Sequence, residues 1–375
     1  MDAPDGLRHH SGVFRLQGRT MRLAIRMAAL AGLWLVLGLA WAQRVEGDRA
    51  AARGLYEAEV PVNGQGAAER AQGFARALAE VLGKVSGDRG AASKPGIGQE
   101  LRRAGDFVKS YDYRQDEGRS ASGAPSFRTT LVVRFDPAEV DAIAATLGLP
   151  VWPEPRPKPV LWLAIDDGRG PRLVALGQSE AARAVLDRAS ERGYRLGLPA
   201  GSAAEQAGVG AIWREDVGAI ARLSNRYQPP MQLIGKLYRA KGGGWIADWT
   251  FVDHGDVLAT WTSSHADARR AMAAGADGAA DALSEKYAKV SAPVDPPGEY
   301  RVLVTGIDSS EDFLRLAGFL QSASVVRGIR PLRAGPGSLE LELDLVTGLA
   351  GFRRMADGSD VLSGGDGDPA TFQLR

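Results

Sequence analysis

Two proline-rich segments constrain this chain more than any other feature, because they divide it. Residues 150–159 carry a proline at almost every second position, and residues 291–298 form a second proline-rich segment. Alternating prolines favour an extended, semi-rigid backbone and remove the N–H groups that a helix or a central strand needs. We therefore expect two linkers between three folded parts, and we prefer this interpretation of 150–159 to a binding motif for a PxxP reader.

Composition is that of a globular protein and excludes several kinds of site. Of the 375 residues, 45% are hydrophobic and 24% charged, which suits two or three domains. Cysteine is absent, so thiol nucleophiles, cysteine zinc sites and disulfides are excluded. His254 and His265 are the only histidines after His10, too few for a multi-histidine metal site. A net charge of +1 gives no electrostatic reason to expect nucleic-acid binding.

Residues 21–42 have the order of a secretory signal peptide. A basic start with Arg22 and Arg26 precedes an apolar run, and small residues at Ala40 and Ala42 allow cleavage before Gln43. That run is short for a bilayer span, which needs roughly 20 residues. We expect a periplasmic protein with no integral membrane segment in the mature chain. Residues 1–20 precede this leader and suggest a start codon assigned too early.

The first domain is expected over 55–149 as an α/β unit. A strand at 55–62 is followed by apolar residues at helical spacing between Ala67 and Val85, and alternation predicts another strand at 127–135. Asp136 before Pro137 is typical of a helix N-cap.

The middle domain is expected over 160–290. A buried strand at 160–165 comes first, and three alternating runs at 231–240, 245–253 and 257–264 predict an antiparallel meander. An alanine-rich segment, 265–289, predicts a helix over one face of what should be a mixed sheet.

The last domain, 299–375, repeats the order strand, helix, strand, strand, helix, strand. Ser309 is placed to cap its first helix, and leucines alternate with acidic residues between Leu339 and Leu345. This order predicts a ferredoxin-like fold. The fold class expected for the whole chain is therefore α/β (α+β), with three small sandwich domains.

Three groups of polar residues are candidates for chemistry, and a structural explanation is preferred for each. Asp166 and Asp167 follow a buried strand, where α/β sheets often bind ligands, but Asp-Asp-Gly is also a common turn. Residues 253–256, Asp-His-Gly-Asp, fit a hairpin turn better than a ligand set. Glu340, Glu342 and Asp344 fit a solvated strand face better than a cation site. We therefore assign no catalytic, cofactor-binding or metal-binding residue.

Trp245, Trp249 and Trp261 are the weak candidates for partner binding. Trp245 and Trp249 share the parity of one predicted strand, and Trp261 belongs to the next. They belong to the core if the closing helix covers that face, and otherwise form an aromatic partner surface. The core interpretation is preferred.

Several segments of the chain resemble two known families. The segments 60–65, 81–87, 108–113, 162–168, 234–237 and 245–249 resemble the bacterial family called domain of unknown function 2066. Residues 231–237, the Gly242-Gly-Gly-Trp245 hairpin, and Gly255-Asp256 before the final helix resemble the amino-terminal domain of the periplasmic TolB protein. The first resemblance implies no activity, and the second implies protein–protein contact in the envelope without catalysis.

The function expected from these features is that of a non-enzymatic periplasmic accessory or scaffold protein of the cell envelope. Envelope proteins are the expected partners, no cofactor is expected, and the sequence does not identify a small ligand. The alternative is a carboxylate-dependent hydrolase or cell-wall-modifying enzyme that uses Asp166 or Asp167.

Overall fold

The computed structural model describes residues 54–119, 125–227, 230–290, 292, 294–365 and 367–375. The signal peptide predicted at 21–42 and the preceding residues 1–20 lie outside the described residues. Helices and mixed or antiparallel sheets build the described chain, so the predicted α/β class is correct. In this part of the protein every helix is too short or too polar to span a bilayer.

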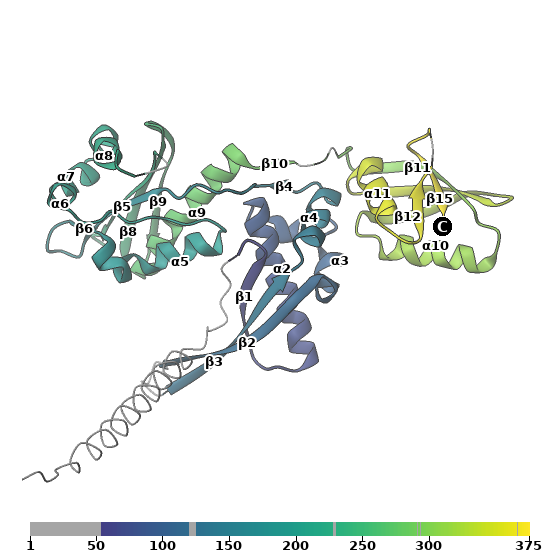
Figure 1. Ribbon diagram of the computed structural model, residues 1–375, viewed down its shortest axis with the longest axis horizontal. Helices are drawn as coiled ribbons and strands as arrows, with labels where there is room; N and C mark the ends of the chain where they lie inside the picture. Colours follow the sequence, from purple (N-terminus) through teal and green to yellow (C-terminus); the bar gives the residue numbers. More distant parts are fainter. Residues whose placement is uncertain (1–53, 120–124, 228–229, 291, 293, 366) are drawn as a thin grey trace, which may run out of the picture. The chain divides into compact units, whose positions relative to one another are not determined.

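The first domain is a three-stranded antiparallel sheet in the order β1-β3-β2, with helix α2 packed on it (Figure 1). Leu78, Val81 and Val85 of α2 are buried against the sheet, as the helical spacing predicts, whereas Ala67 and Ala71 at the start of the predicted face are exposed. Asp136 caps α4 by accepting a hydrogen bond from the Ala138 N–H at 2.9 Å. The elements are β1 (Glu57–Val62), α2 (Ala67–Ser86), α3 (Ile97–Arg102), β2 (Val108–Arg119), β3 (Pro125–Phe135) and α4 (Pro137–Thr146).

The middle domain is a five-stranded mixed sheet in the order β6-β5-β7-β8-β9. β5 runs parallel to β7, and the remaining neighbours are antiparallel. α5 and α9 pack on one face, whereas α7 and α8 pack on the other (Figure 1). Its elements are β5 (Val160–Asp166), β6 (Arg172–Val174), α5 (Arg183–Glu191), α6 (Ala203–Ala207), α7 (Val209–Trp213), α8 (Val217–Ser224), β7 (Met231–Arg239), β8 (Trp245–Asp253), β9 (Asp256–His265) and α9 (Ala268–Tyr287).

The last domain differs from the predicted ferredoxin-like plan at one edge. Its sheet has the order β12-β13-β11-β15-β14, and β15 runs parallel to β11. A single strand after α11 would return antiparallel to β11, but the added strand β14 reverses the chain once more. The elements are β11 (Gly298–Thr305), α10 (Ser310–Ser322), β12 (Val326–Gly335), β13 (Ser338–Leu345), α11 (Gly348–Asp357), β14 (Leu362–Gly364) and β15 (Thr371–Leu374).

The proline-rich segment is packed and is not a free spacer. Its first two residues, β4 (Pro150–Val151), pair antiparallel with β10 (Lys289–Val290), the segment that follows α9. The next residue, Trp152, is only 1% exposed, and its N–H donates to the Val85 carbonyl at 2.8 Å. The Trp152 side chain packs in the core of the middle domain, whereas its backbone N–H holds the segment to helix α2.

Candidate functional site

The Asp166-Asp167 pair forms a turn. Asp166 Oδ1 accepts the N–H groups of Gly168 at 2.8 Å and Gly170 at 3.0 Å, so this carboxylate stabilises the loop after β5. Asp167 Oδ2 pairs with Arg172 at 2.8 Å, and this contact holds the pKa of Asp167 below its usual value. Both carboxylates therefore have structural partners within the turn.

Residues 253–256 form the hairpin between β8 and β9. His254 and Gly255 have φ values of 51° and 93°, which a two-residue type I′ turn requires. Asp253 is buried below this turn, where its carboxylate contacts His254 Nδ1 and Lys286 Nζ, each at 2.5 Å. Burial alone raises the pKa of Asp253, but these two contacts outweigh it and the pKa is lowered. The cluster anchors α9 to the hairpin.

The alternating carboxylates of β13 face arginines across the sheet. Glu342 lies opposite Arg301 of β11 and Arg330 of β12, and it pairs with Arg330. Asp344 Oδ1 lies 2.5 Å from Arg327. This ladder of opposite charges explains the acidic residues without a bound cation.

The three tryptophans pack against the core that α9 covers. Trp249 is 2% exposed and stacks on Trp261 with ring centroids 6.5 Å apart, whereas Trp245 and Trp261 are partly buried against the same core. Glycines make room for these rings. A Cβ at Gly235 or Gly275 would lie 2.2 or 2.5 Å from the Trp249 ring. The sheet and the helix thus approach each other at the tryptophans.

The opposite face of the same strands carries a polar cavity of 350 Å³. Asp248, Thr250, Thr260 and Thr262 contribute to its lining, together with Glu215 from the loop before α8. Asp248 is the centre of the polar contacts: its Oδ1 accepts from the Thr262 hydroxyl at 2.7 Å, and its Oδ2 accepts from the Tyr238 hydroxyl at 3.1 Å. Unlike the three groups of polar residues predicted from the sequence, this arrangement opens onto a strand edge.

Lys236 interacts with two carboxylates at this cavity. Lys236 Nζ lies 2.5 Å from Glu215 Oε1 and 3.5 Å from Asp248 Oδ2. Burial alone lowers the pKa of Lys236, but the contacts with Glu215 and Asp248 outweigh it and raise that pKa, so Lys236 is protonated at neutral pH. The three side chains together therefore carry one net negative charge.

Strand β9, which forms one wall of this cavity, is the last strand of its sheet. Edge strands are usually protected from further pairing by proline, by charged side chains, by bulges or by being short. In the described chain, β12 carries Pro331, several arginines and two register shifts, and β6 and β14 have three residues each. β9 has ten residues without proline, lysine or arginine, and its register shift lies beside the hairpin turn.

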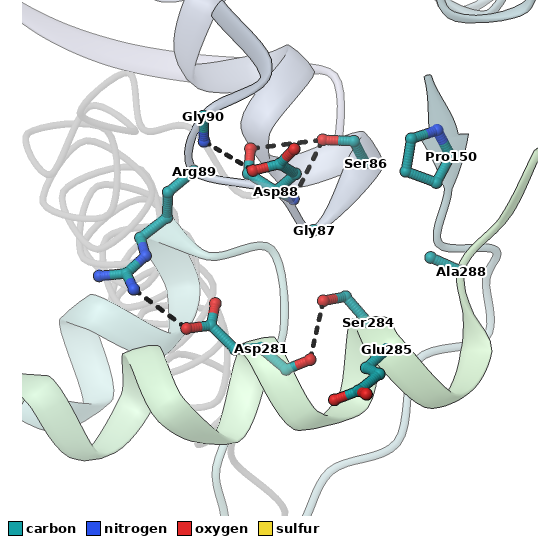
Figure 2. A pocket seen from close by; sticks show the side chains of 10 residues that line it. All are labelled: Ser86, Gly87, Asp88, Arg89, Gly90, Pro150, Asp281, Ser284, Glu285 and Ala288. Carbon is teal, nitrogen blue, oxygen red and sulfur yellow. Dashed lines mark hydrogen bonds and ion pairs between the residues drawn. The ribbon is translucent and has the colours of Figure 1, made fainter. Parts of the chain in front are cut away.

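A second region with cavities lies where the first domain meets the middle domain. A cavity of 790 Å³ lies between the loop at Ser86–Gly90 and helix α9. Figure 2 shows its lining side chains, which include Asp281 and Ser284 of α9. Arg89 crosses the cavity to Asp281 Oδ2 at 3.0 Å, and a Cβ at Gly87 would lie 2.2 Å from Ser284 Cβ. The polar groups of the loop thus already have partners, which indicates a structural contact.

Two arginines fix this junction through the C-terminal end of α2. Arg192 is 4% exposed; it donates to the Gly87 carbonyl at 2.8 Å and pairs with Asp277 and Asp281 at 2.8 and 2.7 Å. Arg156 donates to the Val85 carbonyl at 3.2 Å. Burial lowers the pKa of Arg156 to about 10. The last helical carbonyls have no partner within the helix, so these arginines satisfy them.

Comparison with known families gives a match that covers the first domain. Residues 50–153 are similar to a family described as Domain of unknown function (DUF8605). This finding corrects the resemblances inferred from the sequence: the match is to a different family from domain of unknown function 2066, and nothing supports a TolB-like middle domain. Short strings such as Gly242-Gly-Gly-Trp245 occur in many hairpins, which explains why they misled. No curated protein and no solved structure matches the chain significantly.

Glu215, Lys236 and Asp248 were missed by the sequence reasoning because they belong to different elements. Two of the pairings could have been predicted from the hairpin turns. The glycine turn at 242–244 fixes a register in which Lys236 lies opposite Asp248. In the next hairpin Asp248 lies opposite Thr262. Glu215 could not be found in this way, since the loop that carries it reaches the sheet only through packing of α7 and α8.

Proposed function

We propose that this protein is an exported, non-enzymatic component of the bacterial cell envelope that binds other proteins through strand β9. The single observation behind this proposal is the long, unprotected edge of the middle sheet. Such an edge presents a row of backbone N–H and C=O groups with which an extended segment of another chain can pair. The leader pattern at 21–42 supports export to the periplasm.

The outer face of β9 is accessible to a partner. Thr260, Thr262 and Ser264 are exposed on the outer face, while Trp261 and Ser263 pack toward α9. Helix α9 therefore stiffens the strand from one side and leaves the other side open. A pre-formed strand loses little conformational freedom when a partner adds to it, which favours binding.

The alternative function, a carboxylate-dependent hydrolase, has no support among the described residues. Asp166 and Asp167 are engaged in their own turn, and they line neither the polar cavity beside β9 nor the cavity between the Ser86–Gly90 loop and α9.

The test is site-specific photo-crosslinking in intact cells. A photoreactive residue at Ser264, on the outer face of β9, should give an adduct with an envelope protein. The same residue at Gln321, exposed on α10, should give none. Adducts that are equal at the two positions, or none at Ser264, would contradict the use of this edge. A mature N-terminus at Gln43 would support export, and a retained leader would argue against it.

A further inference from the structure

The polar cavity beside β9 indicates which partner segment would fit, an inference that rests on the proposed function. We propose that the strand added to β9 carries a lysine or arginine whose cationic group enters the cavity at Asp248 and Glu215. The ligand is thus an extended peptide segment with a basic residue at one defined position.

Geometry places the cavity within reach of an added strand. Neighbouring strands lie about 4.8 Å apart, so a strand added to β9 would be about 9.6 Å from β8, which carries Asp248. Thr262 stands between them on β9, directly opposite Asp248. A lysine chain extends roughly 6 Å from Cα, over five bonds of about 1.5 Å in zigzag, and the aspartate extends toward it. A residue opposite Thr262 therefore reaches the carboxylate only if its side chain is long.

The charge of the cavity selects a cation over an anion. Two carboxylates share Lys236, and the Glu215 side chain is 44% exposed, so it remains accessible to a second cation. The threonine hydroxyls around it add hydrogen-bond partners without charge. A partner's ammonium or guanidinium group would complete the charge balance, whereas a carboxylate there would meet like charge.

A second copy of the chain does not meet this requirement. Two β9 strands could pair as a symmetric dimer, since a two-fold interface presents the same surface twice. However, β9 contains neither lysine nor arginine, so a paired copy would offer no cation from the added strand. Two cavities that each carry net negative charge would then lie near one another. The observations therefore favour a different chain as occupant.

The test uses three fluorescein-labelled nonapeptides of alternating valine and threonine that differ only at the central residue, which is Lys, Met or Glu. Binding to the full chain is followed by fluorescence anisotropy. We expect the lysine peptide to bind up to about fivefold more tightly than the methionine peptide, the size of a partly exposed ion pair, and the glutamate peptide to bind most weakly. The preference should shrink as salt is raised.

Variants of the cavity residues test whether the preference for the lysine peptide arises at the cavity. Asp248→Asn and Glu215→Gln should each lower the ratio of lysine-peptide to methionine-peptide affinity, and binding of the methionine peptide to each variant measures whether β9 is intact. The matched control, Glu299→Gln, alters an exposed carboxylate of β11 and should keep the full preference. Equal binding of all three peptides would overturn the cationic preference and leave the edge as a docking site. If no peptide binds, the proposed use of the edge is overturned as well.

Discussion

The packing of Trp249 between two glycines leads to a sharp prediction about stability. Gly275 lies within α9, and Gly235 lies on β7 directly opposite Trp249. A Cβ at position 275 would lie 2.5 to 2.6 Å from three atoms of the indole, closer than non-bonded carbon atoms approach. The ring cannot retreat, because Gly235 limits it from the sheet side. Gly275→Ala should therefore destabilise the middle domain.

Two opposing effects set the size of this change. Replacing glycine by alanine inside a helix contributes about 1 kcal/mol of stability. Forcing an extra methyl group into a packed core costs about 1–3 kcal/mol, and a rigid indole held on both sides places Gly275→Ala at the upper end. The net expectation is a loss of about 2 kcal/mol in the free energy of unfolding. Gly218→Ala in α8 is the matched control, since its Cβ would meet nothing closer than 3.6 Å.

Urea unfolding followed by tryptophan emission measures this loss directly. The six tryptophans of the described chain all lie between Trp152 and Trp261, so the signal reports the middle domain and its linker. Gly218→Ala should be neutral or stabilising. Replacing Trp249 by the smaller Phe should reduce the cost of Gly275→Ala, a coupling that a double-mutant cycle detects. A Gly275→Ala protein as stable as the parent would refute the close approach of helix and sheet.

Two further predictions concern charged contacts. Arg192→Met removes a cation shared by Asp277 and Asp281 and should lower the free energy of unfolding by about 2–3 kcal/mol. This loss is smaller than that for a fully buried pair, because the Asp281 side chain is 47% exposed. Calorimetry should show the loss for Arg192→Met and none for Arg270→Met, which changes an exposed arginine of α9. Burial alone would raise the pKa of Asp253, but its contacts lower this pKa below the usual value, so they stabilise the fold above the ordinary aspartate pKa of about 4, and this contribution is lost as pH falls through the folded-state pKa. Lys286→Met should raise that pKa and move acid unfolding to higher pH, whereas Lys241→Met at the exposed turn should not, and identical acid titrations of the two variants would contradict the assignment.

Local patterns in the sequence predicted most of the elements but not their less regular parts. Alternation identified β13 because its leucines face the helices and its acidic residues face arginines. The caps at Asp136 and Ser309 were predicted correctly, since each hydroxyl or carboxylate accepts a nearby backbone N–H. β2 was missed, because its alternate residues are charged and polar and it lies at a sheet edge. An exposed strand shows little alternation of apolar and polar residues, so its sequence does not predict it.

The direction of the strands and the tertiary packing were harder to predict from the sequence than the local structure. The parallel pairing of β15 with β11 depends on the three-residue strand β14, which is too short to give a periodic signal. Pro150–Pro159 was predicted as a linker, and its composition gives no indication that Trp152 anchors it to α2. The polar cavity could be predicted only in part, because cross-strand register relates Lys236 to Asp248 while Glu215 arrives through tertiary packing.

The first domain contacts both other domains through the C-terminal ends of its helices α2 and α4. The C-terminal carbonyls of α2 accept hydrogen bonds from Arg156 and Arg192 of the linker and the middle domain. Those at the end of α4 accept from the last domain: Arg354 donates to Ala145 at 2.9 Å and Thr347 to Thr146 at 3.0 Å. Helix C-termini carry unsatisfied acceptors and a partial negative charge, so each favours a donor brought by another domain. The family match over 50–153 includes these two helices, which supply the acceptors, whereas the donors Arg156, Arg192, Thr347 and Arg354 lie outside it.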